Sequence, residues 1–264
     1  MMQNKEITKT TLNIKQAYPC TTEILKRVAD QFGWEVTTED REERSGEQLI
    51  YWGDVQKIDY VNKQFFDKPG SFIINYFHGF VAVEKKIDHA IALRTMTLLF
   101  SKHFDFFLKT WIYPQEYKSL SLETLLNEKE IDGGFPRFIF KPDEESRANG
   151  IELFEDTVYI FDKVGAKAGV IQTYLNNPLL WDGYKFDIRS HFVVTSLQPL
   201  QIYYSPRTMI RVCTEKFGST SKQKKMQHIT NICFNVSNTE DETSFTRDES
   251  ELQEMLNQKG YKWA

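Results

Sequence analysis

The stretch FIFKPDEESRANGI, residues 138–151, joins a short run of large apolar residues to a loop rich in turn residues. The run 138–141 predicts a strand, because aromatic and β-branched residues bounded by turn residues are typical of strands. Lys141 stands at the end of this strand, and Gly150 and Ile151 follow the loop. A lysine supplies a point charge and a glycine lets backbone N–H groups approach a phosphate, so the stretch suits a phosphate cradle. A surface turn is the alternative interpretation.

Outward from this stretch, the chain changes from helical to strand-like patterning. Helical spacing of apolar residues predicts helices over residues 22–32, with Thr21 or Thr22 as the cap, and over 85–100 and 122–129. A strand is expected over 48–52. After Gly133-Gly134, short apolar runs predict strands over 138–141, 158–161, 169–175, 185–195, 201–204 and 209–214, with a hairpin around residues 197–199 and a last helix from Glu249. Helices followed by strands indicate an α+β architecture.

A second group of charged residues lies in the predicted strand KFDIR, residues 185–189. The period of two puts Lys185, Asp187 and Arg189 on one face. Such a plus–minus–plus row beside a cleft can hold a triphosphate and orient an acceptor carboxylate. The solvated face of an antiparallel strand is the alternative.

A third group is HITN, residues 228–231, with Arg211 upstream. His228 has no second histidine or cysteine at ligand spacing, so no metal site is predicted around it. Thr230 and Asn231 are also good turn and capping residues, which is their structural explanation.

Taken in order, these segments resemble the tubulin tyrosine ligase-like family. The similar blocks are LIYW 49–52, NYFHG 75–79, Lys85-Lys86, FFLKTWIYP 106–114, residues 141–151, IQTYL 171–175, DGYKFDIR 182–189, VVTSLQPL 193–200, Arg211 with Thr214-Glu215, and residues 228–231. The resemblance covers residues 49–231.

The resemblance implies an α+β (α/β) ATP-grasp fold, incomplete at the C-terminus, with a small N-terminal domain. We expect an N-terminal α/β domain in residues 1–70, a central ATP-grasp subdomain in 71–180 and a partial C-terminal subdomain in 181–264. Members of the family use ATP to phosphorylate a carboxylate of tubulin, and the amine of tyrosine, glutamate or glycine attacks the acyl phosphate. Such catalysis depends on positioning and charge neutralisation. The implied function is the addition of glutamate or glycine to tubulin.

Carried over residue by residue, the resemblance implies roles in binding ATP for Lys86, Lys141, Arg147, Gly150, Ile151, Gln172, Tyr174, Leu175, Lys185, Asp187, Thr230 and Asn231. Lys86 and Lys141 would hold the phosphates, residues 147–151 would form a flap over them, and residues 172–175 the adenine hinge. Asp187 would lie near the ribose. Arg189 and Arg211 would face the γ-phosphate and the acceptor as the catalytic residues.

The largest departure from the family concerns magnesium. The family's ligands are an aspartate in a Gly-Phe-Asp strand and a later Glu-Val-Asn, and neither occurs after Asn231. Phosphoryl transfer needs a metal to offset charge on the β- and γ-oxygens, so ATP and Mg are implied but no metal ligand is predicted here. Catalysis by this chain alone is therefore doubtful. Three hypotheses stay open: a ligase completed elsewhere, a catalytically inactive pseudoenzyme acting as a structural or adaptor protein on microtubules or axonemes, and a module that only binds ATP.

Two smaller departures lie in the flap. Ala148 stands where the family has a glycine, and alanine resists positive φ. Asp143, Glu144 and Glu145 add carboxylates that would weaken triphosphate binding if they faced it.

Composition bounds the partners and the compartment. A net charge of −4 argues against bulk binding to nucleic acid or to an anionic membrane, and no apolar run reaches the length of a membrane span. We therefore expect a cytoplasmic protein of the cytoskeleton, with a cilium, axoneme or basal body and a larger ciliary assembly as finer options.

Three cysteines at unrelated spacings are expected to be buried thiols. Because tubulin tails are acidic, Lys216, Lys222, Lys224 and Lys225 are a candidate tubulin-facing patch, or else a solvated loop.

Overall fold

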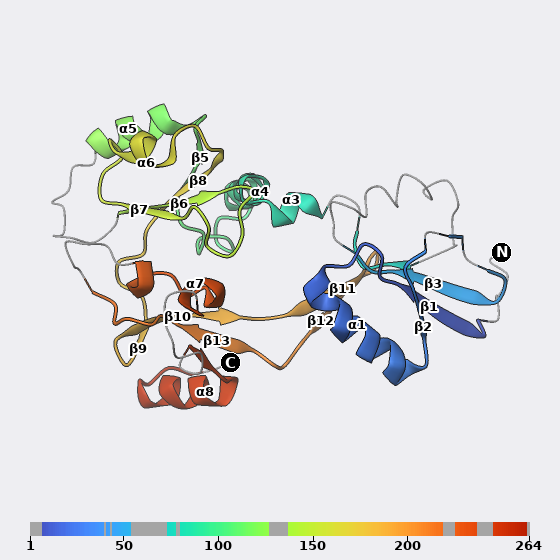
Figure 1. The fold of residues 1–264 in the computed structure, drawn as a ribbon. Coiled ribbons are helices and arrows are strands. Elements are labelled where there is room, and N and C mark those ends of the chain that lie inside the picture. Colours follow the sequence, from blue (N-terminus) through green and yellow to red (C-terminus); the bar gives the residue numbers. More distant parts are fainter. Residues whose placement is uncertain are drawn as a thin grey trace. The chain divides into compact units, whose positions relative to one another are not determined.

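The computed structural model describes residues 7–39, 41–42, 44–53, 73–77, 80–126, 137–218, 225–236 and 245–262. Contacts within the chain divide it into two compact units, residues 1–84 and 85–264. Each unit mixes helices and sheets (Figure 1), so the fold is α+β, as predicted. The three-part division at residues 70 and 180 stays a prediction.

The first unit is built on a parallel sheet with the strand order β2-β1-β3-β4. Its elements are β1 (Lys9–Asn13), α1 (Pro19–Phe32), β2 (Glu35–Thr37), β3 (Glu47–Tyr51), β4 (Ile73–Ile74) and α3 (Val81–Glu84). Leu12 and Ile14 pack against Leu25 and Ala29 of α1 to form its core.

Helix α1 begins at Pro19, earlier than the predicted residue 22. Proline is favourable in the first turn of a helix, because the backbone N–H groups there have no partner within the helix. The prediction of Thr21 or Thr22 as the cap was wrong. Tyr18 is the N-cap residue, and both threonine hydroxyls donate to its carbonyl oxygen. The helix ends as Gly33 takes a left-handed conformation, with φ 66°.

The second unit begins with α4 (Lys86–Leu99) and an antiparallel sheet ordered β5-β8-β6-β7. The strands are β5 (Thr110–Tyr113), β6 (Phe138–Pro142), β7 (Glu152–Phe154) and β8 (Gly169–Thr173), and the helices are α5 (Tyr117–Leu126) and α6 (Ile160–Val164). Figure 1 shows α5 and α6 together along one side of this sheet. Leu120 of α5 and Ile160 of α6 pack there on Trp111, Tyr113, Phe138, Phe140 and Ile171.

A second antiparallel sheet follows, ordered β14-β13-β10-β9. Its strands are β9 (Leu180–Trp181), β10 (Tyr184–Arg189), β13 (Met209–Val212) and β14 (Thr246–Arg247), and α8 (Glu249–Gln258) covers one face. Phe186 and Ile210 pack on that face with Leu252, Met255 and Leu256 of α8. A hairpin of β11 (Phe192–Leu197) and β12 (Leu200–Tyr204) interrupts the sheet, and η1 (Lys225–Gln227) and α7 (Ile232–Val236) follow it.

Several predicted elements need correction. Residues 158–161 do not form a strand: Ile160 and Val164 are buried four residues apart, which is helical spacing, and they belong to α6. The predicted strand 185–195 is two strands, of which β10 pairs with β13 and only β11 with β12. The hairpin around residues 197–199 is present. The predicted helix 122–129 begins earlier, at Tyr117, and residues 127–129 lie outside the described part of the chain.

The three cysteines differ in exposure. Cys213 is buried, and burial raises the pKa of its thiol to about 12. Cys20 and Cys233 are exposed, so for them the prediction of buried thiols was wrong.

Over the described ranges, no helix is long and apolar enough to cross a membrane.

Candidate functional site

Lys141 lies on the face of its sheet that is turned away from the aromatic core. Along β6, Phe138 and Phe140 point into the core, so the strand's period of two sends Lys141 to the other face. Its ammonium donates to Oε1 of Gln172 at 2.9 Å, and Nε2 of Gln172 donates to Oγ1 of Thr110 at 2.9 Å. A hydrogen-bonded row therefore crosses β6, β8 and β5 and holds the lysine in place.

Lys185, on β10, is held by two groups from other segments. Its ammonium donates to the hydroxyl of Tyr174 at 2.9 Å and to the carbonyl oxygen of His228 at 3.0 Å. An ammonium can only donate, so the Tyr174 hydroxyl must give its own proton to Nδ1 of His228, 2.9 Å away. The neutral imidazole then carries its proton on Nε2.

His228 is thus a buried, neutral structural residue. Its side chain is 4% exposed and packs edge-on against Tyr174 and Phe217. Burial, and then the charge of Lys185, lower the pKa of His228 to about 4. The structural interpretation of His228 therefore explains its position.

This low pKa predicts a pH dependence of stability. Between pH 6.5 and about 4 the unfolded chain binds a proton at His228 that the folded chain does not, so the free energy of unfolding falls as the pH falls through this window. The loss should reach about 3 kcal/mol at pH 4. Urea unfolding at pH 7, 5.5 and 4 measures it. His228→Asn keeps an acceptor near the position of Nδ1 and should flatten the slope; an equal slope in the variant would contradict the assignment.

Asp187 and Arg211 face each other across two paired strands. The guanidinium donates from Nε to Oδ1 of Asp187 at 2.7 Å and from Nη2 to Oδ2 at 2.5 Å, and Oγ1 of Thr230 donates to Oδ2 at 2.6 Å. The hydrogen bonds that Arg211 donates to Asp187 raise the pKa of Arg211. Both carboxylate oxygens are therefore engaged, and the two predicted site residues bind one another. Arg189 lies on the same strand and is exposed.

Asn231 has a structural task as well. Its Oδ1 accepts a hydrogen bond from the backbone N–H of Phe234 at 3.3 Å, in the first turn of α7. This is the geometry of a helix-capping residue. Thr230 and Asn231 are thus positioned by Asp187 and by α7.

Three ammonium groups from separate segments share one region. Burial lowers the pKa of Lys141, and the charges of Lys185 and Lys86 lower it further. Burial is also the main cause of the lowered pKa values of Lys185 and Lys86. Cys213 and Asp187 act against it at Lys185, and nearby carboxylates do so at Lys86. Lysines placed where they repel one another and lose water favour a bound anion. Lys86, Lys141 and Lys185 are therefore near enough to act on one another, and their role in binding a nucleotide stays a prediction.

The loop expected to be the flap contains three residues in the left-handed region: Arg147 (φ 57°), Ala148 (φ 66°) and Gly150 (φ 65°). Ala148 adopts this conformation despite its methyl group. Two backbone hydrogen bonds hold the turn: the N–H of Asn149 donates to the carbonyl oxygen of Ser146, and the N–H of Ile151 donates to that of Ala148. Gly150 cannot be replaced in the same way, since a Cβ there would lie 2.8 Å from Cγ of Pro142.

The residues expected to form the adenine hinge have unequal exposure. Gln172 and Tyr174 are bound as described above, and the backbone N–H of Tyr174 donates to the carbonyl of Arg137 at 2.8 Å. Leu175 is 52% exposed. The segment is anchored to neighbouring strands, and its role as a hinge stays a prediction.

The candidate tubulin-facing lysines are only partly described. Lys225 donates to Oε1 of Glu152 at 2.8 Å, and the ammonium of Lys216 lies 5.9 Å from the centre of the Tyr184 ring. Lys222 and Lys224 lie outside the described residues. Lys225 has an intramolecular partner, which weakens its case as a free contact surface.

Magnesium has no ready set of ligands in the described ranges. Nowhere among those residues do three His, Cys, Asp or Glu side chains gather as they would around a metal ion. Asp187, whose charge acts on Lys185, is already bound by Arg211 and Thr230. The residues described here do not fit a magnesium site.

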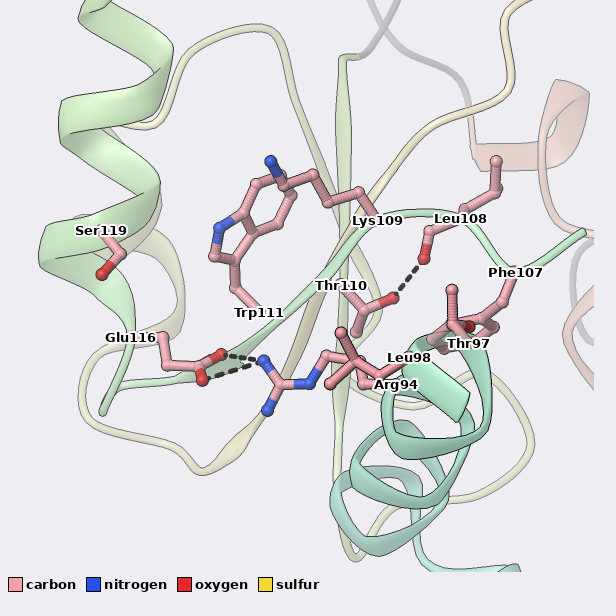
Figure 2. Close-up of a pocket in the computed structure, with 10 residues that line it drawn as sticks. All are labelled: Arg94, Thr97, Leu98, Phe107, Leu108, Lys109, Thr110, Trp111, Glu116 and Ser119. Atoms are coloured by element: carbon pink, nitrogen blue, oxygen red, sulfur yellow. Dashed lines mark hydrogen bonds and ion pairs between the residues drawn. The ribbon is translucent and has the colours of Figure 1, made fainter. Parts of the chain in front are cut away.

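A separate pocket of about 540 Å³ lies between α4, β5 and α5. Figure 2 shows the guanidinium of Arg94 meeting the carboxylate of Glu116 at one wall, at distances of 2.9 and 3.0 Å. Leu98, Phe107 and Trp111 supply apolar walls. None of the predicted site residues lines this pocket, so it is distinct from the lysine cluster. The hydrogen bond between Thr110 and Gln172 links a residue of the pocket to a residue beside Lys141.

The two sheets and the cations between them define a mixed α+β protein with an ATP-grasp-like fold. Residues 67–261, more than half of the chain, match the tubulin-tyrosine ligase family, and the chain belongs to that family.

Relatives in this family include proteins named as polyglutamylases. The chain is 31% identical to human tubulin polyglutamylase TTLL11 over 71% of this chain and 26% of the relative. It is 29% identical to mouse tubulin polyglutamylase TTLL7 over 86% of this chain and 24% of the relative. It is 31% identical to a probable beta-tubulin polyglutamylase of Tetrahymena thermophila over 72% of this chain and 15% of the relative. The chain thus spans about a quarter or less of each relative's length.

Proposed function

We propose that this chain forms the nucleotide-binding part of a tubulin amino-acid ligase, with glutamate as the amino acid added. The choice of glutamate over tyrosine or glycine is supported by relatives that are named tubulin polyglutamylases. The partner proposed is tubulin, and the location proposed is the cytoplasmic cytoskeleton, with a cilium as the finer option.

The observation that carries the proposal is the environment of Lys141. Its ammonium is largely buried, and the two neighbouring charges that shift its pKa are both positive. The charge of a polyphosphate would offset this repulsion, and charge-assisted hydrogen bonds to phosphate oxygens are among the stronger ones in proteins. The described residues therefore fit an ATP polyphosphate, although they do not fit magnesium.

The proposed tasks of the residues follow from where they lie. Lys141 and Lys185 would hold the phosphates, with Arg147, Gly150 and Ile151 in the loop beside them. Gln172, Tyr174 and Leu175 would accept the adenine. ATP, when bound, would supply the phosphoryl group that activates a carboxylate. Arg189 is the exposed cation proposed to face the acceptor, whereas Arg211 would act mainly by holding Asp187.

Lys141→Met tests the nucleotide site. The substitution keeps an unbranched apolar stem of similar length and removes the charge, so we expect the affinity for ATP or tripolyphosphate to fall by about tenfold or more, from the loss of a charged hydrogen bond of about 1.5–3 kcal/mol. Isothermal titration calorimetry measures it. Lys163→Met is the matched control, because Lys163 is an exposed lysine on α6, the helix on the core side of the sheet.

The same variants test the reaction. The native protein is incubated with tubulin, ATP, magnesium and one amino acid at a time, and tubulin is then examined by mass spectrometry. We expect a mass increase with glutamate, lost in Lys141→Met and kept in Lys163→Met. Equal ATP binding by all three proteins would show that Lys141 does not bind the nucleotide. Binding of ATP and tubulin without any mass increase would instead favour the pseudoenzyme.

A further inference from the structure

Lys86 makes contacts that its expected role does not explain. Its ammonium donates to the carbonyl oxygens of Asp143 at 3.3 Å and Glu145 at 2.7 Å. These carbonyls belong to the root of the loop that runs from β6 to Gly150. Two of the three protons of the ammonium are therefore directed at loop backbone.

Asp143 in turn binds α4, the helix that carries Lys86. Its Oδ1 accepts a hydrogen bond from the backbone N–H of Ile87 at 2.8 Å, and its own N–H donates to the carbonyl of Ala168 at 3.1 Å. The N-cap residue of α4, Lys85, makes no side-chain capping bond. The carboxylate of Asp143, 56 residues further along the chain than Ile87, therefore caps the N-terminus of α4. The free N–H groups and the helix dipole favour a negative charge at this end of a helix.

The remaining acidic residues of the loop do not share this arrangement. Glu144 pairs with Lys85 at 3.7 Å, and its side chain is 85% exposed. Such a surface pair contributes little. The carboxylate of Asp143 is committed to the start of α4, so the expected repulsion of a triphosphate by this residue is reduced.

We infer that Lys86 and Asp143 form a reciprocal latch, which fixes the root of the loop 143–150 to the first turn of α4. Lys86 is then a positioning residue that holds the flap, and Lys141 is the lysine directed at the anion. The role of Lys141 toward the anion rests on the proposed function. The latch between Lys86 and Asp143 does not depend on it. The latch would constrain a loop in which Arg147, Ala148 and Gly150 take left-handed conformations.

Trypsin cleavage after Arg147 tests the latch without any ligand. Arg147 is exposed at the tip of the loop, and proteolysis of a segment follows how often that segment opens. Removing a charged hydrogen bond of about 1.5–3 kcal/mol should open the loop about tenfold more often. We therefore expect Lys86→Met and Asp143→Ala each to speed cleavage at Arg147 about tenfold or more, as measured by mass spectrometry of the fragments. The melting temperature should fall by only a few degrees, so the fold itself is kept.

Two matched variants separate the latch from a general loosening. Asp143→Asn keeps an oxygen that can accept from Ile87, and asparagine caps helices as well as aspartate does, so its cleavage rate should stay near that of the unaltered protein. Lys85→Met breaks only the exposed pair with Glu144 and should change the rate less than about twofold. Unchanged cleavage in both Lys86→Met and Asp143→Ala would overturn the latch, as would equal acceleration by Lys85→Met.

A second readout distinguishes positioning from direct binding. If Lys86 mainly holds the loop, Lys86→Met should weaken tripolyphosphate binding clearly less than Lys141→Met does. Equal losses would make Lys86 a phosphate ligand and overturn its role as a positioning residue. If tripolyphosphate binds none of these proteins, the proposed nucleotide site fails, whereas the cleavage result still decides the latch.

Discussion

Replacing Glu47 by alanine is expected to lower the free energy of unfolding of the first unit by about 3–5 kcal/mol, because it leaves the guanidinium of Arg41, whose side chain is only 17% exposed, without its partner. The side chain of Glu47 is 2% exposed. It accepts hydrogen bonds from Arg41 at 2.6 and 2.7 Å, from the backbone N–H of Arg44 at 2.9 Å and from the hydroxyl of Thr11. The hydrogen bonds from Arg41 are the main cause of the lowered pKa of Glu47.

Urea unfolding, followed by the fluorescence of Trp34 beside the core of this unit, measures the loss. Lys9→Ala is the matched control: Lys9 pairs with Glu35 at 2.6 Å, but their side chains are 41% and 62% exposed, so the cost should stay below about 1 kcal/mol. Replacing both Arg41 and Glu47 by leucine should cost less than the sum of the two single changes. A Glu47→Ala variant as stable as Lys9→Ala would show that the buried pair contributes nothing.

The same residues explain why part of the fold could not be predicted. Strand β1, KTTLN, reads as a polar segment, and no strand was expected there. Thr11 and Asn13 are nevertheless each 1% exposed. β1 lies between two parallel partners, where strands are buried on both faces, and the hydroxyl of Thr11 finds Glu47 more than thirty residues later. A pattern based on apolar alternation cannot detect a strand whose buried residues are polar and paired at long range.

Where the signal was local, the prediction was close. Strand β6 and helix α4 lie within a residue of the expected bounds, because aromatic alternation and helical spacing are read over adjacent residues. The last helix begins at the predicted Glu249, where Asp248 and Glu251 form a capping box. The run 158–161 misled because its aromatic residues favour a strand, while the burial of Ile160 and Val164 is decided by the sheet beneath them.

The site shows the same division between local and distant information. Alternation along β10 correctly placed Lys185 and Asp187 opposite Phe186, since this follows from the period of two alone. The pairing of Asp187 with Arg211, and of Lys86 with the loop at Asp143, depends on sequence separations of 24 and 57 residues. No spacing rule predicts such contacts. The capping box at Asp248 was also not predicted, although Asp and Glu three residues apart could have indicated it.

The second large effect is expected at Gly169, where β8 begins beside β6. A Cβ on this residue would lie 2.5 Å from the carbonyl oxygen of Lys141 and 2.8 Å from Cε2 of Phe140. Phe140 is fully buried, so neither its ring nor the backbone of β6 can move aside without separating the two strands. Gly169→Ala should therefore destabilise the protein by about 3 kcal/mol, the upper part of the range for overpacked sites.

The same displacement should reach the proposed nucleotide site. Lys141 pairs with Val170 across the strands, and its ammonium is held by Gln172 of β8, so a shift between β6 and β8 moves the charge away from its position. We expect Gly169→Ala to bind tripolyphosphate more weakly even at temperatures where it is folded. Urea unfolding and calorimetric titration measure the two effects. Gly218→Ala is the control, because a Cβ there meets no atom within 4 Å and should change stability by less than about 0.5 kcal/mol. If Gly169→Ala behaves like Gly218→Ala, the close approach of the two strands does not position Lys141.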